Sequence, residues 1–173
     1  MVAQIPLLTE QQIQDRVIEL ATKLNSDYDG KNLLVVGILK GAFMFFSDMV
    51  RRLTVPMAVD FMIVSSYTDT ETTGKINVHY DLRESITGKD VLIVEDIVDT
   101  GITLNAIRQM LLQRAPASLK ICALLDKKER RLVNVPVDYV GFDIPNEFVI
   151  GYGIDYNNNY RNLPYITVYK KEG

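Results

Sequence analysis

Several residue types that build common functional sites are nearly absent from this sequence. Its 173 residues contain one cysteine, one histidine and no tryptophan. A structural zinc site or a Ser-His-Asp triad therefore has too few of the side chains it needs. The cysteine, Cys122, lies in an apolar run and is expected to be a buried core thiol rather than a nucleophile. His79 lies in a polar–apolar alternation and is expected on a solvated strand face.

Long apolar runs and a strong excess of one charge are also missing. No apolar run approaches the ~18 residues that a membrane span needs, and no secretion signal opens the chain. The net charge of −3 argues against a dedicated nucleic-acid binder. We therefore expect a single cytoplasmic domain over residues 1–173, with no membrane or nucleic-acid partner.

Strand and helix patterns alternate along the chain. A capping box at Thr9 and Gln12 predicts a helix, and an apolar stripe at helical spacing continues it. A second helix is predicted over residues 42–53 and a third from residue 103 onward. Short apolar or alternating runs predict strands over residues 33–39, 57–64, 76–80, 91–94, 119–125, 137–142, 148–151 and 165–169. This order predicts an α/β fold with a mainly parallel central sheet flanked by helices.

Residues 91–104 carry the strongest functional signal. Residues 91–94 are apolar and mostly β-branched, which favours a strand buried on both faces of a parallel sheet. The carboxylates Glu95 and Asp96 follow at once, and Asp99 precedes a small-residue turn over residues 100–103. Apolar residues at helical spacing come next, so Thr103 is predicted to be the helix N-cap.

A strand, a small-residue loop and a helix N-terminus together favour a phosphate, because free N–H groups and the helix dipole attract anions. The three acids of this loop would nevertheless repel a polyphosphate. A ligand with two ends resolves the conflict: a phosphate at residues 100–103, and hydroxyl groups or a bound cation at Glu95 and Asp96. A ribose 5-phosphate fits this description. Neither a Walker loop nor a G-x-G-x-x-G fingerprint is present.

Two other predicted strands deliver polar groups to the same edge of the sheet. Lys40 and Gly41 follow residues 33–39, and Lys127 follows residues 119–125. In open α/β sheets, ligands bind outside the carboxyl ends of the strands. We therefore expect these residues and the loop after residue 94 to line one crevice.

The pattern of an apolar strand, Glu-Asp, two apolar residues and Asp-Thr-Gly-x-Thr resembles the phosphoribosyl-pyrophosphate (PRPP) motif of the type I phosphoribosyltransferases. The similarity extends to the bacterial 6-oxopurine members of that family. Matching pieces are residues 39–41, 59–61, 66–67, 125–127, 140–145, 148–156 and 160–164. The resemblance implies purine salvage: Mg²⁺-assisted transfer of the phosphoribosyl group from PRPP to hypoxanthine or guanine, with release of pyrophosphate. It also implies a small hood, a flexible lid loop and a homodimer or homotetramer.

The same resemblance assigns roles to particular residues. Glu95 and Asp96 hold the ribose hydroxyls and, with Asp155, the metal ion, while Asp99 faces the purine N7 as general base. The other implied substrate-binding residues are Thr100, Gly101, Ile102 and Thr103 around the 5′-phosphate, Lys40, Gly41 and Arg161 at pyrophosphate, Lys127, Phe148 and Val149 at the base, and Ser66 and Tyr67. The family also has a non-proline cis peptide at Lys40-Gly41.

Plainer interpretations exist for most of these features. Lys40-Gly41 and residues 155–159 are also explained as turns, Phe148 as a core aromatic, and Lys127 as one charge in an exposed Asp-Lys-Lys-Glu-Arg-Arg run. Residues 65–75 are predicted to be a mobile lid, although an exposed hairpin fits the same composition. Two other functions are phosphoryl transfer on an aspartate, which needs a D-x-D-x-T order, and RNA-binding nucleotide sensing, which a basic surface would indicate.

Overall fold

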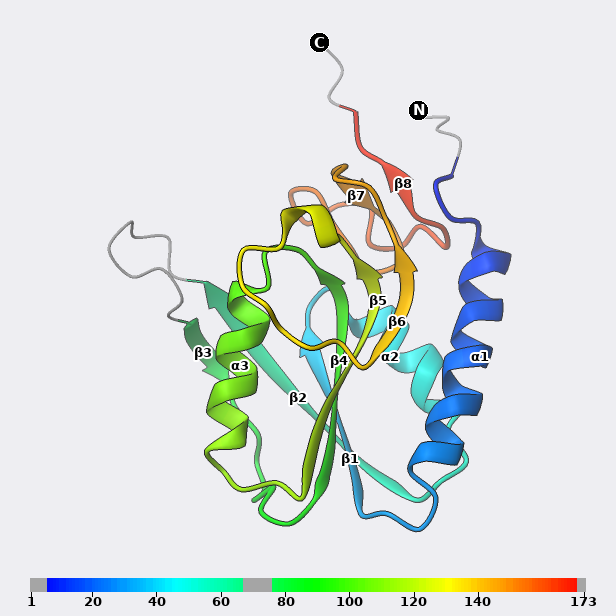
Figure 1. Cartoon of the computed structure of the whole chain (residues 1–173). Helices are drawn as coiled ribbons and strands as arrows, with labels where there is room; N and C mark the ends of the chain where they lie inside the picture. The colour runs from blue at the N-terminus through cyan, green and yellow to red at the C-terminus, as the bar shows by residue number, and fades with distance from the viewer. Residues whose placement is uncertain (1–5, 67–75, 171–173) are drawn as a thin grey trace.

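The structure is a computed structural model that describes residues 6–66 and 76–170. The elements run in the order α1 (Glu10–Asp27), β1 (Leu33–Leu39), α2 (Phe43–Val50), β2 (Met57–Ser66), β3 (Ile76–Tyr80), β4 (Asp90–Val98), α3 (Ile102–Leu112), β5 (Ser118–Asp126), η1 (Lys128–Arg130), β6 (Tyr139–Asp143), β7 (Val149–Ile150) and β8 (Thr167–Val168). Strands and helices alternate as the sequence predicts (Figure 1).

The central sheet has six strands in the order β3-β2-β1-β4-β5-β6. All neighbouring pairs are parallel except β2 and β3, which form an antiparallel extension at one edge. The α/β prediction with a mainly parallel sheet is therefore confirmed. The chain moves from β1 to β2 in one direction, while β4 lies on the other side of β1. This reversal of strand order places a topological switch point between β1 and β4.

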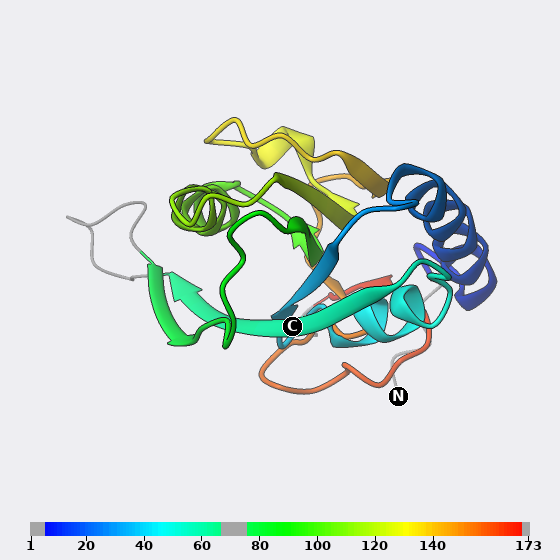
Figure 2. The same ribbon diagram turned by 90° about the horizontal axis from the view of Figure 1, so that it is seen from below.

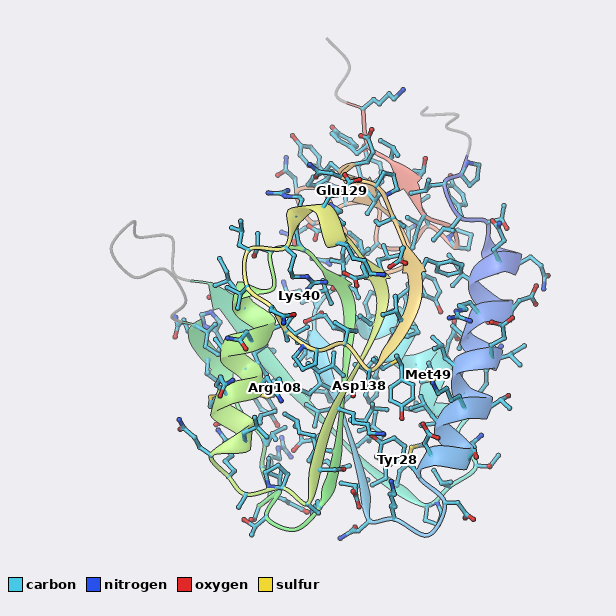
Figure 3. All side chains as sticks on the ribbon, viewed as in Figure 1. Tyr28, Lys40, Met49, Arg108, Glu129 and Asp138 are labelled. Atoms are coloured by element: carbon cyan, nitrogen blue, oxygen red, sulfur yellow. The ribbon has the colours of Figure 1, made fainter. Side chains whose placement is uncertain are left out.

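Helices cover the two faces of the sheet, with α1 and α2 on one face and α3 on the other (Figures 1 and 2). Tyr28 and Met49 lie on the α1 side, whereas Arg108 projects from α3 on the opposite side (Figure 3). Each face has its own core of fully or nearly buried apolar side chains. Strands β1, β4 and β5 are covered on both faces, which is why their central residues read as continuous apolar runs.

Local sequence signals account for the first helix. Thr9 Oγ1 accepts a hydrogen bond from Gln12 N, and Gln12 Oε1 accepts one from Thr9 N, so the predicted capping box is confirmed. The apolar stripe of α1 is buried at Ile13, Val17, Leu20 and Leu24. Cys122 is a buried free thiol, as predicted.

Several predicted boundaries need correction. Strand β4 extends to Val98, so Glu95 and Asp96 belong to the strand rather than to the loop after it. The reason is that β5 continues to pair with β4 beyond the apolar run, as far as Val98 with Asp126. Strands β7 and β8 cover only part of the predicted ranges, and β6 runs from Tyr139 to Asp143 rather than over residues 137–142.

Strands β7 and β8 form a small antiparallel sheet above the carboxyl end of the central sheet (Figure 1). An isolated bridge between Leu8 and Ile166 joins this hood to the segment before α1. The lid predicted at residues 65–75 lies almost entirely outside the described residues. Among the described residues, no helix is long and apolar enough to cross a membrane.

Candidate active site

The switch point between β1 and β4 is where the predicted site residues gather. Lys40 and Gly41 follow β1, and residues 95–103 end β4 and begin α3. Lys127 follows β5, the next strand in the sheet. Because these strands are parallel, the three segments lie at one edge of the sheet, and the predicted convergence is confirmed.

The Lys40-Gly41 segment packs directly against the end of β4. A Cβ atom at Gly41 would collide with the Asp96 carboxylate, and one at Gly153 would collide with the Gly41 carbonyl oxygen. Both contacts therefore need glycine, since backbone and carboxylate approach each other too closely for any side chain. A non-proline cis peptide is present, but it joins Leu39 to Lys40, one bond earlier than the predicted Lys40-Gly41 position.

Glu95 and Asp96 form an adjacent carboxylate pair at the end of β4. Glu95 Oε1 accepts a hydrogen bond from Asp96 N at 3.0 Å, and Asp96 Oδ1 accepts one from Ile97 N at 2.7 Å. Desolvation raises the pKa of both carboxyls, that of Glu95 well above its usual range, where the neighbouring Asp96 charge adds to the effect. The pair is therefore suited to accept hydroxyl hydrogen bonds or to bind a cation, either of which favours its charged form.

The turn after Asp99 leaves the first turn of α3 without a side-chain cap. Gly101, not Thr103, is the N-cap, with a φ of +82° that glycine adopts readily and other residues rarely do. Thr103 lies within the first turn, so its predicted capping role is wrong. Within the described residues, the one side-chain acceptor at this turn is Thr100 Oγ1, which lies 3.4 Å from Ile102 N. A hollow of about 120 Å³ borders this turn and Glu95, as a phosphate cradle requires.

Lys127 and Asp99 lie on neighbouring strand ends. Lys127 N donates a hydrogen bond to Val98 O at 2.9 Å, which places the lysine beside the start of the Asp99 loop. Lys127 is only 5% exposed, so it is not one more solvated charge of its basic run. Burial lowers the pKa of its ammonium, and the Asp99 carboxylate opposes that shift. Its Nζ makes no hydrogen bond or ion pair with any residue that the structure describes.

Phe148 is 52% exposed, so it is not the core aromatic of the plainer interpretation. Its ring makes edge contacts with Tyr156 at 5.8 Å and Tyr169 at 6.0 Å between centroids, and these two tyrosines stack at 4.2 Å. An exposed ring supported from behind is suited to stack on a planar ligand. Val149, next along the chain, is buried in β7.

Asp155 and Arg161 form an ion pair in the loop between β7 and β8. Arg161 Nη2 lies 2.7 Å from Asp155 Oδ1, and Arg161 Nη1 donates to Gly153 O at 2.7 Å. Gly153 in turn contacts Gly41, so this loop reaches the segment after β1. Asp155 does not join Glu95 and Asp96: among the described residues, no group of three or more acidic, histidine or cysteine side chains could hold a metal ion.

Ser66 ends β2, and Tyr67 lies outside the described residues.

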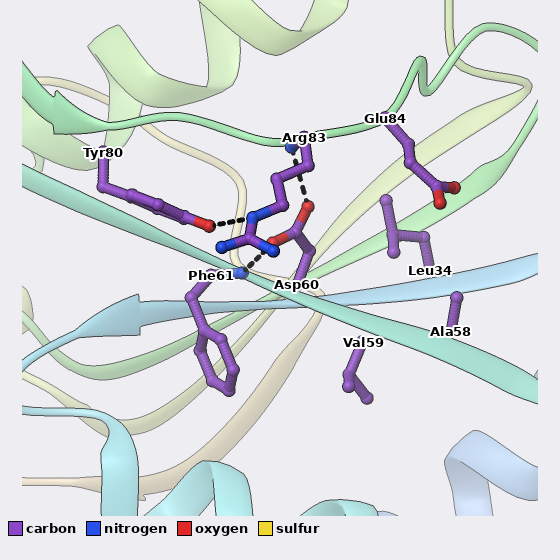
Figure 4. Close-up of a pocket in the computed structure, with 8 residues that line it drawn as sticks. All are labelled: Leu34, Ala58, Val59, Asp60, Phe61, Tyr80, Arg83 and Glu84. Carbon is purple, nitrogen blue, oxygen red and sulfur yellow. Dashed lines mark hydrogen bonds between the residues drawn. The ribbon is translucent and has the colours of Figure 1, made fainter.

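A separate hollow of about 370 Å³ borders β2 near Asp60 and Arg83 (Figure 4). Its polar groups bond one another, since Asp60 accepts from the backbone N–H of Phe61 and Arg83, and Arg83 Nε donates to Tyr80 Oη. Leu34, which lines this hollow, lies at the start of β1. The hollow is therefore away from the carboxyl ends of the strands, where the candidate site lies.

Residues after Lys127 also contribute to the site, although their charged run gave no periodic signal. Arg131 forms an ion pair with the buried Asp126, and Arg130 Nε lies 3.2 Å from Asp99 Oδ1. Leu132 N and Val133 N both donate to Thr100 O. These hydrogen bonds fix the backbone of the turn over residues 100–103. The role could not be predicted from the sequence, because it depends on contacts between distant segments.

Paired acids near the end of β4, a glycine N-cap on α3 and a lysine just after β5 match the pattern of a phosphoribosyltransferase. A family model for the phosphoribosyl transferase domain matches residues 6–157, and the chain belongs to this family. Within it, the chain is similar to enzymes acting on 6-oxopurines. The hypoxanthine-guanine phosphoribosyltransferase of Dictyostelium discoideum is 51% identical over 171 residues, which cover 96% of this chain and 95% of the relative.

Bacterial relatives give the same result. The hypoxanthine phosphoribosyltransferase of Salmonella typhimurium is 50% identical over 163 residues, 92% of each chain. A crystal structure of the Staphylococcus aureus hypoxanthine phosphoribosyltransferase matches with a TM-score of 0.93 and 51% identity, covering 96% of this chain and 91% of that one. Fold and family therefore agree with the resemblance that the PRPP motif suggested.

Proposed function

We propose that this protein transfers the 5-phosphoribosyl group of PRPP to hypoxanthine or guanine and releases pyrophosphate. The observation that carries the proposal is Lys127, a residue only 5% exposed beside the Asp99 loop, whose ammonium has no protein acceptor within the described residues. Such a donor is free to bond a ligand, and the 6-oxo group of a purine supplies an acceptor. The similarity to hypoxanthine and hypoxanthine-guanine phosphoribosyltransferases supports the same substrates.

Each segment has a distinct task in this reaction. Displacement at the ribose C1 builds positive charge on the sugar and needs the diol, the 5′-phosphate and the base held in line. The backbone N–H groups after Gly101 bind the 5′-phosphate, and the Glu95–Asp96 pair accepts the ribose hydroxyls. Asp99 accepts the proton of the purine N7, while Phe148 stacks on the base with its exposed ring.

Pyrophosphate is proposed to leave across the segment after β1. Lys40 is exposed there, and Arg161 presents a guanidinium that suits phosphate oxygens. The Gly41–Gly153 contact holds the two segments together. We also propose Ser66 and Tyr67 as substrate-binding residues, and substituting each by alanine tests this.

We further propose that the reaction uses Mg²⁺. The Glu95–Asp96 pair offers only oxygen donors, and Mg²⁺ is commonly held by one or two carboxylates together with substrate oxygens. Asp155, on a different segment, would hold metal at the pyrophosphate end. When bound, the ion neutralises charge on the leaving group. Calorimetric titration of Mg²⁺ into the chain with PRPP should show binding that is weakened in Asp96→Asn and unchanged in Asp143→Asn, which carries an exposed acid of β6.

A homodimer or homotetramer is proposed as the assembled form. Phe43 on α2 is 37% exposed and Val59 on β2 is 50% exposed, while the Phe46–Phe61 contact joins the same two elements. Exposed apolar side chains on adjoining elements are typical of subunit interfaces. Sedimentation of Val59→Glu against the unaltered chain tests the assembly.

We expect the reaction in the cytoplasm, because PRPP is highly charged and does not cross a bilayer unaided.

The direct test of the function is a steady-state assay of PRPP with each purine in turn. Formation of the nucleoside monophosphate and of pyrophosphate is measured with hypoxanthine, guanine, xanthine and adenine. Turnover with hypoxanthine or guanine and its absence with adenine supports the proposal. No turnover with any purine, under conditions where PRPP binds, would refute it.

A further inference from the structure

An arginine that the sequence did not single out forms an ion pair with the carboxylate of Asp99. Arg130 Nε lies 3.2 Å from Asp99 Oδ1, and this oxygen is buried without a hydrogen-bond partner. The Asp99 side chain as a whole is 38% exposed. Since Oδ1 is buried, Oδ2 is the carboxylate oxygen of this side chain that remains accessible. The two oxygens of one carboxylate therefore have different surroundings.

The backbone around Arg130 explains why the guanidinium reaches Asp99. Arg130 ends η1, where its N–H donates to Lys127 O at 3.1 Å, and Lys127 N donates to Val98 O. Beyond η1, Leu132 N and Val133 N donate to Thr100 O at 2.9 and 3.1 Å. The segment is thus fixed to the residues immediately before and after Asp99. The hydrogen bonds to Val98 O and to Thr100 O together place Arg130 beside the Asp99 carboxylate.

Stability alone does not account for this ion pair. Arg130 is 46% exposed, and ion pairs at such positions contribute only about 0–1 kcal/mol. The same short helix contributes Lys128 to a comparison pair with Asp143 of β6, and these side chains are 66% and 61% exposed. What distinguishes the Arg130 pair is its partner, the residue that faces the purine N7 in the proposed reaction.

We propose that Arg130 is a positioning residue for Asp99: its guanidinium holds the buried Oδ1 so that Oδ2 points to the purine. This inference rests on the proposed function. Without Arg130 the carboxylate is free to rotate about its side-chain bonds, and a misplacement of about 1 Å can reduce a rate by ~10²-fold. Arg130 acts through Asp99, so its effect should disappear once Asp99 no longer accepts the proton.

The test is a double-mutant cycle in single-turnover experiments with the full-length chain. Nucleotide formation from PRPP and hypoxanthine is followed for the unaltered chain, Arg130→Gln, Arg130→Lys, Asp99→Asn and the double variant Asp99→Asn/Arg130→Gln. Lys128→Gln is the matched control. We expect Arg130→Gln to slow the step by roughly 10- to 100-fold, Arg130→Lys to recover part of the loss, and Lys128→Gln to stay within about twofold. In the Asp99→Asn background, Arg130→Gln should change the rate by less than about twofold.

The affinity for PRPP separates positioning from a structural role. PRPP binding and thermal stability should be unchanged in Arg130→Gln if only Asp99 is affected. An equal effect of Arg130→Gln with and without Asp99, or a loss of PRPP affinity instead of rate, would overturn the proposal, as would an unchanged rate. An unaltered chain that forms no nucleotide would refute the proposed function and this inference together, whereas an active chain insensitive to Arg130→Gln refutes the inference alone.

Discussion

Replacing Lys127 by methionine should separate substrate selectivity from stability in this enzyme. The side chain is 5% exposed, and its Nζ makes no hydrogen bond or ion pair within the described part of the chain. Methionine keeps a similar length and apolar stem but removes the charge. The substitution therefore deletes the proposed donor to the purine 6-oxo group without opening a large cavity.

The size of the loss follows from the contact removed. A hydrogen bond from a charged donor contributes about 1.5–3 kcal/mol, which corresponds to a decrease of roughly 10- to 150-fold in kcat/KM for hypoxanthine. Adenine carries an amino donor at the same position, so the unaltered enzyme should reject it by as much as ~10⁴–10⁵-fold. Lys127→Met should reduce the ratio of kcat/KM for hypoxanthine to that for adenine. Hypoxanthine loses its hydrogen-bond donor, and adenine no longer places its amino group against the lysine ammonium.

Although Lys127→Met should lower kcat/KM for hypoxanthine, it should raise the free energy of unfolding. Burial lowers the pKa of Lys127 in the folded state, so the unfolded chain binds more protons between the folded pKa and the ordinary value of about 10.4. The folded enzyme should therefore gain stability as pH rises through that window, whereas Lys127→Met should not. At neutral pH the variant should unfold at a higher urea concentration than the unaltered chain, and the difference should shrink toward pH 10.

The assay pairs steady-state kinetics for hypoxanthine and adenine with urea unfolding at several pH values. Lys128→Gln is the control, because Lys128 is the exposed neighbour that pairs with Asp143. Unchanged selectivity in Lys127→Met, or equal losses in the two variants, would remove Lys127 from the base site. Lower stability of Lys127→Met at neutral pH would contradict the desolvation argument.

Three other substitutions test separate parts of the structure. Asp99→Asn should fold normally, by circular dichroism, but lose ~10²–10⁴-fold in kcat, and a value within threefold of the unaltered enzyme would reject the general-base role. Gly101→Ala should cost about 1–3 kcal/mol in urea unfolding and weaken PRPP binding by calorimetry, because φ is +82° and the new Cβ lies 2.6 Å from Val133 O; unchanged PRPP affinity would contradict this. Thr9→Ala should lose about 1 kcal/mol of stability with kcat unchanged, since only the cap of α1 is removed; no loss would show that the capping box contributes nothing.

Local signals explain most of what the sequence predicted about the fold. Strands β1 and β3 begin and end at the predicted residues, because apolar or alternating runs with polar flanks define them. The end of β4 could not be predicted in this way. Glu95 and Asp96 look like loop residues, yet their backbone continues the ladder with β5, which places Glu95 opposite Ala123. Pairing with a distant strand overrides the local preference of acidic residues for loops.

The candidate site shows the same division. Residues that follow buried strands, such as Lys127, could be assigned to the crevice because parallel strands end at a common edge. Arg130 could not, since its run of charges looks like a solvated loop. The hydrogen bond from Lys127 N to Val98 O and those from residues 132 and 133 to Thr100 O bring it to Asp99. The Gly41–Gly153 contact likewise depends on two loops more than a hundred residues apart.

The N-cap of α3 is a glycine, whereas the sequence predicted a threonine. Capping rules selected Thr103, because a hydroxyl at the start of a helix normally accepts one of the free N–H groups. In the structure the N-cap of α3 is Gly101 instead, which has no side chain to offer. Among the described residues, only the long Thr100 Oγ1 contact remains. Free N–H groups at a helix start favour an external anion. A phosphate that replaces the missing cap would explain why this helix, unlike α1, has no capping box, so binding PRPP should stabilise α3 against amide exchange more than α1.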